Sequence, residues 1–322
     1  MSLATNTLML KVSRVRAEAK DILSLELTSA TGDELPPFTP GSHLELSLGN
    51  GQTRHYSLLN DPAERYRYVI AVGLTADTRG GSRFIHETVR QGDSLKASFP
   101  RNNFPLDENA EHYCFVAGGI GITPILSMIR WCHSRGKDWR LIYAARNRVR
   151  AAFYEDLLEL DSSRISFHFT DEQKGSRLGV GDLLLTLRPD EQLYCCGPDP
   201  LMQAVKKEGE PIAERLHFEW FVPPELPELV QSDTENFEVV LSRSGQRLRV
   251  GPDQTILEAV EAEGIDAPFS CRAGICGSCE VGVIAGTPEH RDFILSDEEK
   301  AANNCMMICV SRSVGPSLEL DL

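Results

Sequence analysis

Four cysteines near the end of the chain constrain its fold more than any other feature. Cys271, Cys276 and Cys279 are spaced C-x4-C-x2-C, and Cys309 follows after 29 intervening residues. This spacing is the plant-type ligand pattern of a [2Fe-2S] cluster, in which four thiolates hold two irons. The sequence therefore predicts that these four cysteines are cluster ligands.

The loop that carries the first three cysteines contains two glycines, Gly274 and Gly277. Three thiolates of one tight loop can surround a small cluster only if the backbone folds back on itself, and glycine tolerates the dihedral angles that this requires. A zinc site is the alternative, but zinc generally uses paired short spacings. An iron-sulfur cluster transfers one electron at a time, so we expect the rest of the chain to supply those electrons.

Length and composition describe a soluble protein of two or three domains, at 322 residues. No apolar run of the sequence approaches the roughly 18 residues of a membrane span, and the N-terminus lacks the form of a signal peptide. We therefore expect a cytoplasmic protein with no membrane partner. Reduced thiols are then expected at the five remaining cysteines, Cys114, Cys132, Cys195, Cys196 and Cys305.

The chain is acidic, with a net charge of −14. Residues 236–322 contribute 14 acidic against 7 basic side chains, a balance of −7. Such a surface repels nucleic acid phosphates, so we expect no nucleic acid partner. The charge serves either solubility or docking to a positively charged protein.

The first segment, to about residue 107, is rich in short alternating strands separated by turn residues, which predicts a small antiparallel barrel. It contains the sequence Arg54-His55-Tyr56-Ser57 and, further on, Arg79-Gly80-Gly81-Ser82 before a predicted helix. Arg54 can hold a phosphate bidentately, and Ser82 with the N–H groups after the two glycines can form an anion site at the helix start. Tyr56 offers an aromatic face to a flat ring.

From about Asn109 strands alternate with helices, which predicts a parallel sheet covered by helices on both faces. The strand His112–Ala117 leads into Gly-Gly-Ile-Gly-Ile-Thr-Pro at 118–124, and a helix is expected over Pro124–Ser134, capped by Thr123. Glycines between a strand and a helix let the backbone approach a pyrophosphate. The predicted nucleotide-binding residues of this turn are Gly118, Gly119, Gly121 and Thr123.

A later strand, Gln192–Cys196, ends in Cys-Cys-Gly-Pro. Ligands of open parallel sheets bind outside the carboxyl ends of the strands, where Gly197 and Pro198 are expected to join the glycine turn. Asp171, after a third strand, can bond a ribose hydroxyl and favours NADH. Arg146, Arg148 and Lys174 leave NADPH open, because a basic group can accept the 2′-phosphate.

These motifs together resemble a known family. R-x-Y-S with a later G-G-S, and G-x-G-x-x-P in place of the Rossmann G-x-G-x-x-G, resemble the ferredoxin-NADP reductase superfamily. The order of flavin domain, nucleotide domain and C-terminal ferredoxin is similar to the phthalate dioxygenase reductase family, which includes reductases of vanillate and carnitine oxygenases. The likeness spans essentially the whole chain.

The resemblance implies a set of site residues and cofactors. It implies FMN as the flavin, contacted by Arg54, Tyr56, Ser57 and Ser82 and flanked by the strand residues Ala71, Val72 and Gly73. It places Cys196 near the nicotinamide and Phe221 on the flavin, although Trp220 leaves open which ring covers it. FAD is also open, because no sequence feature excludes an adenine platform.

The resemblance also implies three domains: a flavin barrel at residues 1–107, an NAD(H)-binding α/β domain at 108–222 and, after a linker at 223–235, a β-grasp ferredoxin at 236–322. In the last, strands are expected at Phe237–Ser242, Gln246–Val250, Val281–Ile284, Met306–Val310 and Ser317–Asp321, with a helix at Thr255–Glu263 and Cys309 within the fourth strand.

A nicotinamide gives up two electrons as hydride and a [2Fe-2S] cluster accepts one, whereas a flavin handles both. We therefore expect an NADH-dependent oxidoreductase that passes electrons through FMN and [2Fe-2S] to a Rieske-type terminal oxygenase for an aromatic acid or a carnitine-like amine. The alternatives are a reductase for another acceptor, such as a cytochrome P450 or a di-iron hydroxylase, and an iron-sulfur redox sensor. We expect a monomer, because no heptad pattern is present.

Overall fold

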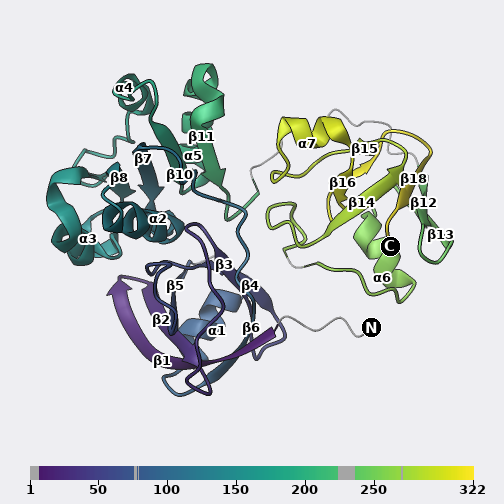
Figure 1. The fold of residues 1–322 in the computed structure, drawn as a ribbon, viewed down its shortest axis with the longest axis horizontal. Coiled ribbons are helices and arrows are strands. Elements are labelled where there is room, and N and C mark those ends of the chain that lie inside the picture. The colour runs from purple at the N-terminus through teal and green to yellow at the C-terminus, as the bar shows by residue number, and fades with distance from the viewer. Residues whose placement is uncertain (1–6, 76–77, 79, 224–235, 270) are drawn as a thin grey trace. The chain divides into compact units, whose positions relative to one another are not determined.

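The computed structural model describes residues 7–75, 78, 80–223, 236–269 and 271–322. The chain forms two compact units, Met1–Glu219 and Trp220–Leu322 (Figure 1). The first unit contains a six-stranded and a five-stranded sheet, and the second contains a five-stranded and a two-stranded sheet. The predicted linker lies largely outside the described residues, and the predicted domain boundaries stay predictions. Within the described part of the chain, no helix has the length and apolar character of a membrane span.

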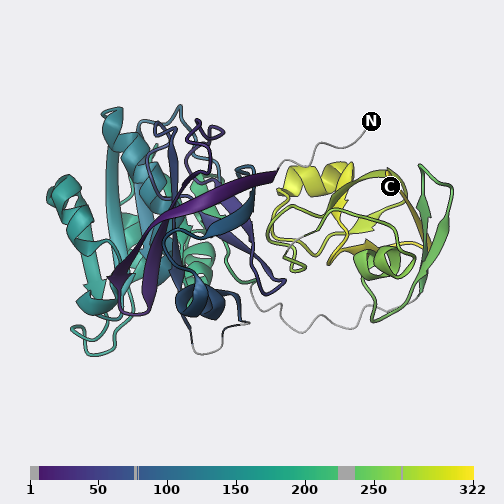
Figure 2. The same ribbon diagram turned by 90° about the horizontal axis from the view of Figure 1, so that it is seen from below.

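The first sheet is the predicted antiparallel barrel. Its elements are β1 (Thr7–Ala19), β2 (Ile22–Ser29), β3 (His43–Ser47), β4 (Thr53–Ser57), β5 (Arg67–Gly73), α1 (Gly81–Thr88) and β6 (Ser94–Ser98). The strand order is β4-β3-β6-β1-β2-β5, and the edge strands β4 and β5 contact each other, which closes the sheet. Figure 2 shows β1 as the long purple strand of this sheet. The alternating apolar residues predicted for these strands, such as Leu44 and Leu46, are fully buried in the barrel core.

The second sheet is parallel throughout, as predicted, with the strand order β11-β10-β7-β8-β9. Its strands are β7 (His112–Gly118), β8 (Asp138–Ala145), β9 (Ile165–Phe169), β10 (Gln192–Cys196) and β11 (Leu216–Glu219). The connecting helices are η1 (Gly119–Gly121), α2 (Ile122–Ser134), η2 (Arg148–Arg150), α3 (Tyr154–Asp161), η3 (Ser162–Arg164), α4 (Val180–Leu185), α5 (Asp199–Glu208) and η4 (Glu210–Arg215). The central strand β7 is buried from Tyr113 onward, as expected for a parallel strand covered on both faces.

The prediction that Thr123 caps a helix beginning at Pro124 is wrong. The 3-10 turn η1 runs directly into α2, which begins at Ile122, so Thr123 lies within the first helical turn. Its hydroxyl donates to the carbonyl of Ile120, 3.0 Å away, and does not cap the helix.

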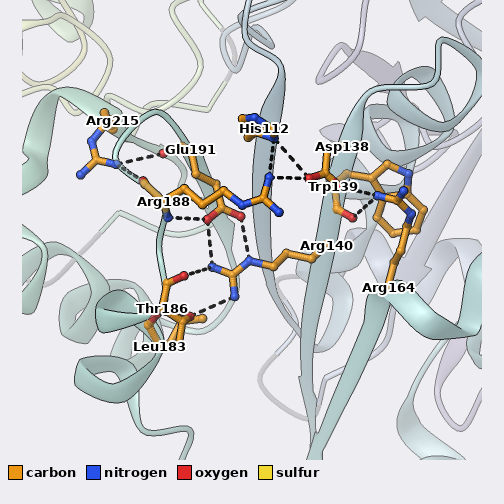
Figure 3. A network of polar contacts seen from close by, with 10 residues as sticks. All are labelled: His112, Asp138, Trp139, Arg140, Arg164, Leu183, Thr186, Arg188, Glu191 and Arg215. Carbon is orange, nitrogen blue, oxygen red and sulfur yellow. Dashed lines mark hydrogen bonds and ion pairs between the residues drawn. The ribbon is translucent and has the colours of Figure 1, made fainter.

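The amino ends of the parallel strands are held by a network of ion pairs (Figure 3). Arg140 donates to both carboxylate oxygens of Glu191, at 2.7 and 3.0 Å, and the Glu191 side chain is almost entirely buried. Asp138 accepts from Arg164 and Arg188, each at 2.7 Å, and these bonds lower the pKa of Asp138 although its partial burial opposes them. The network therefore ties the strand ends together at the edge opposite the glycine turn.

The second unit has the predicted β-grasp arrangement, with the sheet order β13-β12-β18-β14-β16. Its elements are β12 (Phe237–Leu241), β13 (Arg247–Val250), α6 (Ile256–Ala262), β14 (Glu280–Ala285), β15 (Pro288–Glu289), α7 (Asp297–Ala302), β16 (Cys305–Met307), β17 (Arg312–Ser313) and β18 (Ser317–Leu320). Thr255 caps α6 in a capping box with Glu258.

The prediction that Cys309 lies within a strand is wrong. β16 ends at Met307, and the backbone N–H groups of Val310 and Ser311 both bond the Met307 carbonyl. Cys309 therefore lies in a tight turn, which allows its side chain to reach the cysteine loop.

Candidate functional site

The cysteine loop, residues 271–279, has the folded-back backbone that its glycines predict. Gly274 and Gly277 have φ of +67° and +69°. At Gly274 a Cβ would lie 2.7 Å from a methyl group of Val310, so a side chain is excluded there for packing reasons as well. Arg272 adopts a left-handed φ of +54° without being glycine. Its guanidinium pairs with Glu261 and covers the ring of Phe269, which restrains the strained residue.

The sulfurs of the four predicted ligands lie close together, and Cys309 interacts with both Cys271 and Cys279. Cys276 bonds Cys271, and this bond together with burial raises the pKa of Cys276. Cys309 bonds Cys279, which lowers the pKa of Cys279. The C-x4-C-x2-C spacing with a distant fourth cysteine distinguishes this set from a zinc site, which generally uses paired short spacings. The site fits a [2Fe-2S] cluster.

The predicted flavin phosphate site is assembled at the start of α1. The Arg54 side chain of β4 lies across Gly81, where a Cβ would be 2.7 Å from its Cγ and Nε. Gly80 has φ of +96° and precedes the helix, and the Ser82 hydroxyl lies 2.6 Å from that of Thr78. A guanidinium beside a glycine-lined helix start is a suitable anion site. These residues fit a flavin phosphate, while Arg79 lies outside the described residues.

The strands β4 and β5 bring the other predicted flavin residues together. Ser57 ends β4, and Ala71, Val72 and Gly73 end the contacting edge strand β5. Tyr56 is largely buried, and this burial raises the pKa of its phenol to about 12, so it stays neutral. Nothing bulky stands at Gly73, where a Cβ would lie 3.6 Å from Ile120 of the nucleotide turn. The end of the flavin strand therefore contacts the glycine turn within the first unit.

The predicted nucleotide residues converge at the carboxyl ends of β7 and β10. A Cβ on Gly118 would be 2.5 Å from Pro198, and one on Gly121 would be 2.2 Å from the carbonyl oxygen of Cys196. A Cβ on Gly197 would be 3.0 Å from the backbone of Gly118. Only glycines permit this close approach of the two strand ends. The result is a cradle of backbone at the start of α2, which fits a pyrophosphate.

Asp171 lies just beyond β9, at the same edge of the sheet. Its carboxylate accepts from the side-chain amide of Asn147 at 2.8 Å, and Arg146 lies 3.6 Å away. Arg146 and Asp171 are both well exposed. A ribose hydroxyl could bond Asp171, whereas a 2′-phosphate could bond Arg146. The geometry therefore fits NADH and NADPH alike, and the predicted role of Asp171 stays a prediction.

Glu219 is a site residue that our sequence analysis missed. It ends β11, directly opposite Cys196 in the register of the parallel pair β10 and β11. Ser57 donates to its carboxylate at 3.4 Å, so one side chain joins the flavin strand to the nucleotide sheet. Loss of solvation raises the pKa of Glu219 to about 8, although the Ser57 bond opposes this. The pKa of the fully buried Cys196 thiol is also raised, by burial and by Glu219.

Two aromatic residues, Trp220 and Phe221, follow β11, and which of them covers the flavin stays open. Trp220 is partly buried, and Phe221 is 37% exposed. Both follow Glu219 directly, so they leave the nucleotide sheet at its ligand-binding edge.

Comparison with known proteins identifies two domain families in the chain. The sequence profile of the 2Fe-2S iron-sulfur cluster binding domain matches residues 239–314, and that of the oxidoreductase NAD-binding domain matches residues 115–207. The chain is 41% identical over 314 residues to phenoxybenzoate dioxygenase subunit beta of Ectopseudomonas oleovorans, covering 97% of each protein.

Two solved structures are similar over 98% of the chain. One is phthalate dioxygenase reductase, described as a modular structure for electron transfer from pyridine nucleotides to [2Fe-2S], with 38% identity, a TM-score of 0.72 and 98% of that chain covered. The other is an intact type IV self-sufficient cytochrome P450 monooxygenase, with 38% identity and a TM-score of 0.90. The present chain spans 41% of the length of that monooxygenase.

Proposed function

Because this chain belongs to the phthalate dioxygenase reductase family of oxygenase reductases, we propose that it is the NADH-dependent reductase component of a two-component Rieske-type oxygenase. The chain is an oxidoreductase that takes electrons from NADH and passes them through FMN and a [2Fe-2S] cluster. Its partner is a terminal oxygenase in a transient complex, and the substrate class we propose is an aromatic acid or a carnitine-like amine.

One observation carries the proposal: the flavin strands and the nucleotide cradle meet in one place. Ser57 bonds Glu219, and Gly73 contacts Ile120 of the glycine turn. A nicotinamide held at the carboxyl edge of the sheet therefore lies beside a flavin held on β4 and β5. Hydride transfer requires this proximity and orientation more than it requires any acid or base.

The side chains at this meeting point stay neutral at pH 7. Cys196 keeps its proton because its thiol is buried, and Glu219 keeps its proton because its pKa is about 8. Reduction of the flavin adds negative charge at the site, and a neutral carboxyl does not oppose this charge as a carboxylate would. Protonated Glu219 can also donate one hydrogen bond toward a bound ring. We propose Phe221 as the aromatic residue that yields to the nicotinamide.

The flavin, when bound, accepts a hydride and releases its electrons singly, and this property links a two-electron donor to a one-electron cluster. Arg54, Gly80, Gly81 and Ser82 would hold its phosphate, and the four cysteines would hold the two irons. The backbone of Gly118–Gly121 and Gly197 would hold the nucleotide pyrophosphate. FMN requires only the phosphate site that we propose at the start of α1.

An anaerobic titration of the purified protein tests this function. We expect stoichiometric flavin and two irons per chain, FMN as the flavin released by acid, and loss of flavin absorbance on adding NADH. The reduced protein should give the electron paramagnetic signal of a [2Fe-2S] centre. A protein with full iron and flavin that stays oxidised in excess NADH would contradict the proposal, and release of FAD would overturn the choice of FMN.

A cytochrome P450 is a second candidate acceptor, because the chain matches part of a self-sufficient P450 monooxygenase with a TM-score of 0.90. The two candidates differ in what oxidises the reduced protein. Mixing the NADH-reduced chain with a Rieske oxygenase or with a ferric P450 under carbon monoxide distinguishes them. Rapid reoxidation by the P450 alone would favour the second candidate.

A further inference from the structure

Tyr143 is a buried residue of β8 that contacts the glycine turn from within the sheet. Its side chain is fully buried, and its hydroxyl donates to the carbonyl oxygen of Gly119 at 3.0 Å. Gly119 is the first residue of η1 and has a left-handed φ of +54°. The tyrosine therefore bonds the turn at its left-handed glycine.

Burial raises the pKa of the Tyr143 phenol, and the nearby backbone of Ala152 opposes this rise. Ala152 is fully buried and precedes Phe153, whose φ of +60° starts α3. The hydroxyl thus lies near two backbone segments that are distant in sequence, and it bonds the carbonyl of one of them, at Gly119. Removing the hydroxyl leaves the Gly119 carbonyl without this partner.

Other contacts restrain the rest of the turn but act away from Gly119. Thr123 bonds the carbonyl of Ile120, and Gly121 packs against the backbone of Cys196. A Cβ at Gly119 would meet nothing within 4 Å. Packing around the Gly119 Cα therefore does not restrain the conformation of this residue. The Tyr143 hydroxyl acts on the opposite, carbonyl side.

We infer that Tyr143 is a positioning residue that fixes the conformation of the turn Gly119–Gly121 for the pyrophosphate of the nucleotide. This inference rests on the proposed function, since it assigns the pyrophosphate to this turn. Without the Tyr143 bond the Gly119 peptide can rotate, which changes the direction of the neighbouring N–H groups. Because these groups would bind the pyrophosphate, the affinity for it falls. The reacting ring is held separately, so the limiting rate of flavin reduction changes little.

The chain offers a matched control for Tyr143→Phe. Tyr113 is also fully buried and lies on the neighbouring strand β7, but near its amino end. Its hydroxyl donates to the carbonyls of Asp107 and Ala110, at 2.8 and 2.7 Å. Tyr113→Phe therefore deletes the same group from the same sheet, with bonds of the same kind, away from the turn.

The experiment measures binding of ADP-ribose, which carries the pyrophosphate without the nicotinamide, by calorimetry on the holoprotein. We expect Tyr143→Phe to raise the Kd about tenfold, which corresponds to the loss of about one hydrogen bond, and Tyr113→Phe to leave it within about twofold. In stopped-flow reduction, the apparent Kd for NADH should rise in the same proportion while the limiting rate is retained. Hydrogen exchange at Gly119–Gly121 should accelerate in Tyr143→Phe.

Two outcomes would overturn the inference: an unchanged Kd in Tyr143→Phe, or an equal loss in Tyr113→Phe, which would indicate a general effect on stability. If Tyr143→Phe fails to fold while Tyr113→Phe folds, hydrogen exchange in the wild-type protein decides. Unprotected Gly119–Gly121 amides there would refute a fixed turn. Wild-type protein that binds ADP-ribose but is not reduced by NADH would refute the proposed function and leave the Tyr143 comparison valid. Wild-type protein that is reduced by NADH but does not bind ADP-ribose would refute the inference and leave the proposed function standing.

Discussion

In the wild-type protein we expect the rate of flavin reduction to fall at alkaline pH. Replacing Glu219 by glutamine should abolish this fall. Desolvation raises the pKa of this carboxyl from 4.5 to about 8, so the site favours the protonated form by roughly 5 kcal/mol. Glu219 is protonated in about nine tenths of the molecules at pH 7 and in about one tenth at pH 9. If only this form accepts hydride efficiently, the rate falls about tenfold between these values.

The assay is anaerobic stopped-flow reduction by saturating NADH from pH 6 to 9.5. Wild type should lose rate with an apparent pKa of about 8, whereas Glu219→Gln should show no such loss, because an amide does not ionise in this range. Glu18→Gln is the matched control, since burial also raises the pKa of Glu18, on β1, where it pairs with Arg16. That control should keep the wild-type profile. A Glu219→Gln profile that falls like the wild type would refute the assignment.

The same pKa makes the stability of the first unit depend on pH. The folded state binds the Glu219 proton more tightly than the unfolded chain, whose pKa is near 4.5. The contribution is therefore complete below about pH 4.5 and is lost as the pH rises toward about 8, by at most about 1.4 kcal/mol per pH unit. Denaturant unfolding of Glu219→Gln should lack this loss between pH 5.5 and 8.

Three further substitutions test the cluster, the cradle and the strand-end network. Cys276→Ser removes a predicted iron ligand, so cytochrome c reduction should fall at least about a hundredfold while NADH still reduces the flavin. Gly121→Ala places a methyl group 2.2 Å from the Cys196 carbonyl oxygen, so the strand ends must separate, and the KM for NADH should rise about tenfold or more. Glu191→Gln breaks the buried pair with Arg140 and should lower the free energy of unfolding by about 2–3 kcal/mol in denaturant titrations.

Each of these changes has a control in the chain. Cys305→Ser alters a thiol of the same unit outside the ligand set and should keep cytochrome c reduction. At Gly179 a Cβ has ordinary space, with nothing closer than 3.6 Å, so Gly179→Ala should keep the KM. Glu111 pairs with Lys137 at the surface, and Glu111→Gln should cost less than about 1 kcal/mol. Loss of flavin reduction in Cys276→Ser, or control effects as large as the tested ones, would contradict these expectations.

Local patterns predicted the fold class and the backbone of the cysteine loop. The strand alternation of the barrel and the apolar strands of the parallel sheet are periodic over several residues, so they survive in the structure with small changes at their ends. The left-handed Gly274 and Gly277 follow from the spacing of the cysteines around them. The left-handed Arg272 did not follow, because part of its compensation comes from Glu261, which lies on α6.

End effects were the least predictable from the sequence. Thr123 is a residue type that favours helix caps, but the turn η1 leads directly into α2, which begins before Thr123, at Ile122. Cys309 lies in an apolar run typical of a strand, yet the two bonds to the Met307 carbonyl end the strand two residues earlier. In both places a hydrogen bond to a nearby carbonyl overrides the propensity of the residue type.

Glu219 could not be found from a motif, because its role depends on pairing between distant segments. Its hydroxyl partner Ser57 is 162 residues away in the sequence, and β11 has only four residues at the edge of its sheet. A signal was nevertheless present: a strand that pairs in parallel with β10 must end beside Cys196, so the last residue of such a strand faces the ligand edge. An acidic residue in that position is costly to bury unless it is neutral or bonded. Glu219 meets both conditions, because its raised pKa keeps it neutral at pH 7 and Ser57 bonds its carboxyl group. Both depend on contact between the barrel and the parallel sheet at the proposed place of hydride transfer.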